Sequence, residues 1–139
     1  MKSLILPFFF LLTLPLSGTA RTVLYTTHDR PPEGRDDTVE VVYLDAADTL
    51  QDEWFHQQGI ELSEENAPQI IALLQSPKWQ AQESRLTQAY QGIIQAWQLG
   101  VARVPAVVVD EQWVVYGLTD IHRAQKEIHQ FQQVNGGVR

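Results

Sequence analysis

The chain has 139 residues, of which 17 are acidic and 10 are basic, and its formal net charge is −7 at pH 7. This negative charge argues against nucleic acids and anionic membrane surfaces as direct partners, because both are bound through clustered Lys and Arg. The sequence contains no Cys, which excludes a disulfide framework and thiol redox chemistry. The length suits one domain with its own hydrophobic core.

The first twenty residues predict a secretory signal peptide. Lys2 precedes an almost unbroken apolar run, Leu4–Leu16, and the small residues that end at Ala20 are typical of a signal-peptidase site. The run is shorter than the ~20 apolar residues of a membrane-spanning helix. We therefore expect cleavage after Ala20 and a periplasmic protein with no membrane attachment. Residues 21–139 would form one domain of net charge −8, because Lys2 is lost, with a frayed tail from about residue 135.

Two strands and a helix are predicted next along the chain. Val23–Thr27 is rich in β-branched and aromatic residues, as strands are, and Val39–Leu44 is a continuous apolar run that predicts a strand buried on both faces. Between them, His28–Thr38 contains two Pro and one Gly and is predicted to be a loop. Asp48 is the expected N-cap of a helix from about Thr49 to Gln58.

The middle of the chain predicts two amphipathic helices, Glu64–Gln75 and Trp79–Leu99, and the second has the stronger periodicity. The expected inward faces are Ala67, Ile70, Ile71 and Leu74 on the first helix, and Leu86, Tyr90, Ile93 and Trp97 on the second. We expect the second helix to be a principal element of the core, with Trp97 largely buried.

The C-terminal third predicts a hairpin followed by a helix. Val104–Val109 is an apolar strand with a proline near its start, and Trp113–Tyr116 is its expected antiparallel partner. Thr119 or Asp120 is the expected cap of the last helix. The residues of this helix expected to pack inward are Ile121, Ala124, Ile128 and Phe131.

This order of elements, with Pro105 opening the hairpin, resembles a thioredoxin fold; the segments that carry the resemblance are Val104–Asp110 and Val114–Asp120. The resemblance implies an α/β domain with a thioredoxin-like sheet, a C-terminal antiparallel hairpin and packed helices. It also implies a cis peptide bond between Val104 and Pro105. The reactive Cys pair of redox thioredoxins is absent, so disulfide exchange is excluded. The pairing of the first two strands stays open, because a parallel crossover generally needs a dozen or more residues and usually a helix.

A second resemblance covers nearly all of the chain that follows the signal. Thr26–Pro31, Tyr43–Ala46, Ala96–Gly100 and the hairpin resemble a family of integrating conjugative element proteins that carries a thioredoxin-like domain of unknown function. Its members resemble periplasmic accessory proteins of the type IV secretion systems that move DNA between bacteria. The resemblance implies a role in building or regulating such an apparatus, with other exported proteins as partners, and it supplies no catalytic residues.

The candidate partner-binding surface is the loop after the first strand together with the turn at the cis-proline. Loop residues at the carboxyl end of a strand are where open α/β sheets place their ligands. In a thioredoxin-like fold the two segments face each other. The candidate residues are His28, Asp29, Arg30, Pro31, Val104 and Pro105.

The sequence offers little support for a metal or a cofactor. His122 and His129 share a helix face but lie two turns apart, about 10 Å, which is too far for one ion, and no ligand-spaced motif is present. We therefore expect no metal and no cofactor.

An enzymatic alternative stays open beside the adaptor hypothesis: an unrecognised hydrolase or isomerase that uses carboxylates and His28. The nearby acids are Asp45, Asp48, Asp52 and Glu53, which helix capping and the helix dipole also explain. A pocket that joins His28 to Asp45 or Asp48 would favour chemistry, whereas an exposed apolar surface would favour binding.

Overall fold

A computed structural model describes residues 21–61 and 63–135. The expected signal peptide, residues 1–20, and the end of the expected frayed tail, residues 136–139, lie outside the described residues. The elements are the strands β1 (Thr22–Thr26), β2 (Glu40–Tyr43), β3 (Ala106–Val109) and β4 (Trp113–Tyr116), the helices α1 (Ala46–Gln58), α2 (Ala67–Leu74), α3 (Pro77–Gln98) and α4 (Ile121–Asn135), and a short 3₁₀ turn at Glu64–Asn66.

The fold is mixed α/β, with a four-stranded mixed sheet in the order β2-β1-β3-β4. β1 runs parallel to β2 and antiparallel to β3, and β3 and β4 form the expected antiparallel hairpin. The pairing that the sequence left open is therefore parallel, although the connection over residues 27–39 contains no helix. This connection is held by a hydrogen bond of 3.0 Å from the Glu33 N–H to the Thr119 carbonyl.

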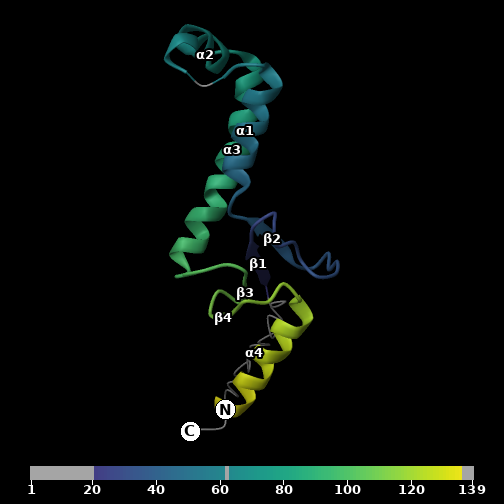
Figure 1. Cartoon of the computed structure of the whole chain (residues 1–139). Helices are drawn as coiled ribbons and strands as arrows, with labels where there is room; N and C mark the ends of the chain where they lie inside the picture. The colour runs from purple at the N-terminus through teal and green to yellow at the C-terminus, as the bar shows by residue number, and fades with distance from the viewer. Residues whose placement is uncertain (1–20, 62, 136–139) are drawn as a thin grey trace, which may run out of the picture.

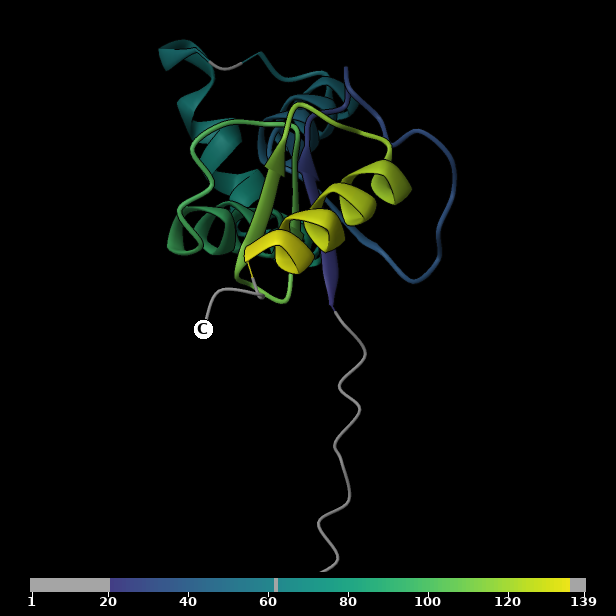
Figure 2. The same ribbon diagram turned by 90° about the horizontal axis from the view of Figure 1, so that it is seen from below.

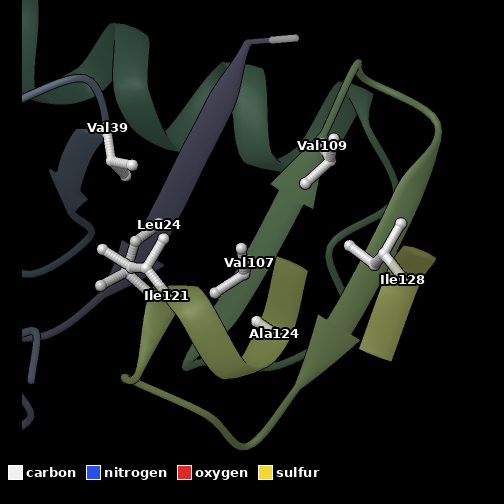
Figure 3. Close-up of a cluster of buried hydrophobic side chains, with 7 residues drawn as sticks. All are labelled: Leu24, Val39, Val107, Val109, Ile121, Ala124 and Ile128. Atoms are coloured by element: carbon white, nitrogen blue, oxygen red, sulfur yellow. The ribbon is translucent and has the colours of Figure 1, made fainter. Parts of the chain in front are cut away.

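The core lies on both faces of the sheet, and β1 contributes to both halves because successive side chains of a strand point to opposite faces. Leu24 faces α4 in a cluster with Val107, Ile121 and other apolar side chains, which converge in Figure 3. Val23 and Tyr25 have the opposite direction and pack in a second cluster that contains Ala96 of α3. Figures 1 and 2 show the resulting layers, with α4 on one side of the sheet and α3 on the other.

β2 and the start of α1 differ from expectation. β2 lies at the edge of the sheet, and its residues are exposed or half-buried, so the prediction of burial on both faces is wrong. α1 begins at Ala46 instead of near Thr49, and Asp45 takes the cap position that we expected for Asp48. The Asp45 side chain makes no capping hydrogen bond to the helix, because it binds a loop residue described below.

The buried face of α3 is also different from the expected one. Gly92 and Ala96 are buried, whereas Tyr90 and Trp97 are exposed, so the prediction that Trp97 is a core residue is wrong. The reason is the close approach of α3 to β2. A Cβ atom added to Gly92 would lie 2.6 Å from Val42 Cγ1, so only small residues fit at the contact.

Three further residues expected to face inward are exposed: Ile71 and Leu74 of α2, and Phe131 of α4. α2 lies at the far end of the α1–α3 pair, away from the sheet, so its apolar face has less core to cover (Figure 1). Phe131 packs edge-to-face on Trp113 at 5.9 Å between ring centroids. In the part of the chain that the structure describes, no helix has the length and apolar character to cross a membrane.

The α3–β2 contact predicts an unusual effect of substituting Gly92. A Gly→Ala change in a helix normally stabilises it by up to ~1 kcal/mol. Here the added methyl meets Val42 Cγ1 at 2.6 Å, and because the β-branched valine is stiff, we expect Gly92→Ala to lower the free energy of unfolding by about 1–3 kcal/mol. Urea unfolding measures it.

The double variant Gly92→Ala/Val42→Ala is the control, since it removes the atom that the new methyl would meet. It should be more stable than the sum of the single effects predicts. Strict additivity, or a stabilising Gly92→Ala, would show that the two elements do not depend on this close approach.

Candidate functional site

The structure brings together the loop after β1 and the turn before β3, the two segments predicted to form the partner-binding surface. β1 ends at Thr26, and the chain turns at once, with the Arg30 N–H donating to the Thr27 carbonyl at 2.9 Å. The buried Thr26 hydroxyl donates to the Arg30 carbonyl at 2.6 Å and holds this turn. Arg30 Nη1 then donates to the Val104 carbonyl at 3.3 Å. The loop after β1 and the turn before β3 thus form one continuous surface.

The peptide bond between Val104 and Pro105 is cis, the conformation that the resemblance to a thioredoxin fold implies. Pro105 is buried, and its carbonyl accepts a hydrogen bond of 2.9 Å from the Gly117 N–H, so it serves as scaffold beneath the surface. Asp29 and Pro31 are exposed, with Asp29 Oδ2 3.8 Å from Arg30 Nε. Of the six candidate residues, the loop residues and Val104 are those a partner can reach.

His28 is held by Asp45 and Tyr43. Its backbone N–H donates to both carboxylate oxygens of Asp45, at 3.2 and 3.0 Å, and its Nδ1 lies 2.8 Å from Asp45 Oδ1. An ionised carboxylate only accepts hydrogen bonds, so Nδ1 carries the proton in this contact. The imidazole stacks on the Tyr43 ring, with 4.2 Å between centroids. Asp45 is one of the acids that the sequence offers as a partner of His28, whereas no pattern in the sequence indicates the contact with Tyr43.

The hydrogen bonds from His28 also favour the ionised form of Asp45. Partial desolvation acts to raise the pKa of Asp45, but the hydrogen bonds from the His28 backbone N–H and side chain outweigh it, and the pKa is lowered from its ordinary value. A carboxylate that orients an imidazole is an arrangement used in general acid–base catalysis. Both side chains are open to solvent, at 49% exposure for His28 and 34% for Asp45, so the pair lies at the surface.

The structure adds a surface that sequence reasoning missed, the α3 stripe, which we define as Tyr90, Ile94 and Trp97. These residues lie at i, i+4 and i+7, on one helix face, and are 46%, 52% and 80% exposed. The chain between Arg85 and Arg103 carries no charged residue. That long neutral interval was the available signal, because a solvent-facing helix in an acidic protein ordinarily carries charges.

Among residues 21–61 and 63–135, no three His, Asp or Glu side chains are grouped so that they could hold a metal ion.

A family model described as "Protein of unknown function (DUF1525)" matches residues 19–134. No curated protein and no solved structure matches the chain.

The exposure of Trp97 predicts that truncating it leaves the fold stable. Trp97→Ala should change the free energy of unfolding by no more than about 0.5 kcal/mol, as for other surface substitutions. The matched control is Trp54→Ala, since Trp54 is 7% exposed and packs on Trp79 at 4.9 Å. That change should cost about 3–5 kcal/mol. Equal losses in urea unfolding for the two variants would contradict the placement of Trp97.

The lowered pKa of Asp45 predicts a pH-dependent contribution to stability. Because the folded-state pKa of Asp45 lies below its ordinary value of 3.8, the stabilisation is present above that value and is lost as pH falls through the folded-state pKa. Asp45→Asn should therefore be less stable than the wild type at pH 7, and the difference should shrink towards pH 3. Unfolding free energies at pH 7, 5 and 3 measure this effect.

The control for that series is Asp48→Asn, which removes one negative charge from the same helix but none of the bonds to His28. An Asp45→Asn deficit that stays constant with pH, or that Asp48→Asn reproduces, would show that the bond to His28 does not set it.

Proposed function

From its exposed surfaces, we propose a function for this chain, which belongs to the DUF1525 family of proteins of unknown function. The protein is a non-enzymatic accessory or adaptor protein of the conjugative, type IV secretion apparatus of an integrating conjugative element, and it binds other exported proteins of that apparatus.

The observation that carries this proposal is the α3 stripe. An apolar group of two aromatic residues and one isoleucine, exposed to solvent and flanked by neutral Gln residues, is a typical centre of a protein-binding surface. Tyr and Trp are enriched among the residues that dominate binding energy, and charged residues are depleted at interface centres. Exposure of these apolar side chains lowers the solubility of the isolated protein, and a bound partner would cover them.

The finer fold assignment is part of the proposal: the domain is thioredoxin-like and lacks the reactive Cys motif. The strand order, the C-terminal hairpin and the cis bond before Pro105 support it. Redox members of that fold hold extended polypeptide between the loop after the first strand and the cis-proline turn. The contact of Arg30 with the Val104 carbonyl places the same two segments side by side in this chain, so this loop surface can be a second contact for a partner.

The location and the apparatus rest on the sequence. The proposed signal peptide ends at Ala20 and directs the protein to the periplasm. The resemblance of Thr26–Pro31 and Ala96–Gly100 to integrating conjugative element proteins supports a role in DNA transfer. The acidic charge is consistent with partners that are proteins instead of the transferred DNA.

One observation favours the enzymatic alternative. His28 and Asp45 meet at 2.8 Å, so a hydrolase or isomerase could use the imidazole as its base. Their solvent exposure weighs against it, because acid–base catalysis gains most in sites that exclude water.

The proposal predicts that each of two surfaces supports mating, and that variants of either surface remain folded. Trp97→Ala, and separately the double variant His28→Ala/Arg30→Ala, should lower the mating frequency by ~10-fold or more, the effect of losing ~1.4 kcal/mol of binding energy. Each variant should also lose cross-links to proteins of the apparatus in donor cells.

The matched control is Phe131→Ala, which removes an exposed aromatic ring from α4, on the other side of the sheet. It should mate like the wild type. Stable variants of both surfaces with wild-type mating and cross-linking would refute the adaptor role. Turnover of a substrate by the purified protein, lost in His28→Ala and Asp45→Asn, would establish the enzymatic alternative.

A further inference from the structure

β2 has a free hydrogen-bonding edge. In the described part of the chain it pairs with β1 alone, and it ends the sheet. The Leu44 N–H donates to the Thr26 carbonyl at 2.8 Å, which fixes the direction of alternate residues. Because successive residues of a parallel strand direct their backbone groups to opposite sides, Val41 and Tyr43 direct their N–H and C=O groups away from β1. Two donors and two acceptors are therefore available in strand geometry.

A groove runs along this edge. It has a volume of about 530 Å³ and is lined by all four residues of β2, by the start of α1 and by α3. Val41 and Val42 point to opposite faces of the sheet, yet both line the groove, so it opens over the strand edge itself. The wall formed by α3 is polar, with the amide side chains of Gln88, Gln91 and Gln95. Such amides can donate to and accept from a bound backbone.

The groove also has a defined direction, and its two ends differ in charge. Val42 meets α3 at Gly92, and the Leu50 carbonyl accepts from Gln82, so α3 runs antiparallel to the chain from β2 into α1. Arg85 therefore lies towards the Tyr43 end. Arg85 has no carboxylate within 4.0 Å among the described residues, whereas Glu40, at the other end, is paired with Arg21 at 2.8 Å. The available charge in the groove is thus one arginine, in a protein of net charge −7.

We propose that the β2 edge binds an extended segment of a partner protein as an added strand, with an acidic side chain of that segment paired to Arg85. The segment would exchange main-chain hydrogen bonds with Val41 and Tyr43, which is the mode of recognition called β-augmentation. Arg85 and Gln95 are ten residues apart on α3, about 15 Å along the helix. About five residues of strand span that length, and this sets the length of the bound segment.

A second copy of the chain is a poorer occupant of this edge. Pairing of two β2 strands would bring together two chains of net charge −7 each. It would also bring the α3 helix of the copy to the same groove, which α3 already lines. The carboxylate of Glu40, the charge that a copy could offer to Arg85, is engaged by Arg21.

The test is an NMR titration of the purified ¹⁵N-labelled protein with six capped hexapeptides. The peptides alternate Val and Thr and carry one Glu, at a different position in each. We expect the largest amide shifts at Val41 and Tyr43. We also expect at least one Glu peptide to bind ~5-fold or more tightly than the same peptide with Gln, as a partly exposed ion pair of ~1 kcal/mol implies.

Two variants locate the charge that the peptide meets. Arg85→Gln should abolish the preference for Glu over Gln while the shifts at Val41 and Tyr43 persist. Lys78→Gln is the matched control, because it removes the same charge from the same helix outside the groove lining, and it should keep the preference. N-methylation of the peptide backbone should abolish binding, since it removes the donors of the added strand.

The proposal would be overturned if none of the six peptides shifts the amide signals of Val41 or Tyr43, or if the shifts centre on the other sheet edge at Trp113–Tyr116. It would also be overturned if β2 pairs with a second copy of the chain. That pairing would appear as shifts at Val41 and Tyr43 that depend on protein concentration in the absence of peptide. Trp97→Ala leaves this groove intact and should bind the peptides like the wild type. Failure of peptide binding and failure of the adaptor role are therefore separate results.

Discussion

Every other part of the structure depends on the position of β1, which is buried along its whole length in the middle of the sheet. It pairs with β2 on one edge and with β3 on the other, and its side chains supply both halves of the core. Leu24 requires α4 on one face, while Val23 and Tyr25 require α3 on the opposite face. Because one strand satisfies all these contacts, its end at Thr26 also determines where the loop with His28 and Arg30 emerges.

The packing of α3 on the sheet links the core to the exposed surface. Gly92 and Ala96 allow the helix to approach the sheet closely, and no larger side chain fits at the contact of Gly92 with Val42. A helix that presents its small residues to the sheet must direct its bulky residues elsewhere, and here Tyr90 and Trp97 point to solvent. The binding surface that we propose is therefore a geometric consequence of the same contact that holds α3 to the sheet.

The acidic residues near the loop after β1 differ in what they do. Asp45 stands at the cap position of α1, but its carboxylate binds the backbone and the ring of His28. This bond connects the end of β1 to the start of α1 without a disulfide. Arg30 extends the same network to the turn before β3. A loop restrained by such hydrogen bonds loses less conformational entropy when a partner binds, which suits a recognition surface.

Local patterns in the sequence determined the order of the elements, the hairpin of β3 and β4, and the loop after β1, because alternation, helical periodicity and Pro or Gly positions act over short distances. The resemblance to a thioredoxin fold, and not a local pattern, pointed to the segments of His28 and Val104, which the structure joins through Arg30. Local patterns could not decide which face of α3 is buried, since Trp97 and Ala96 both lie on an apolar arc, and the close approach of α3 to the sheet at Gly92 and Val42 turns Ala96 inward and Trp97 to solvent. The pairing of Asp45 with His28, the parallel addition of β2 and its free edge were likewise decided by tertiary structure. The first two join positions 17 residues apart in the sequence, the free edge follows from the order of the strands, and no local periodicity records such arrangements.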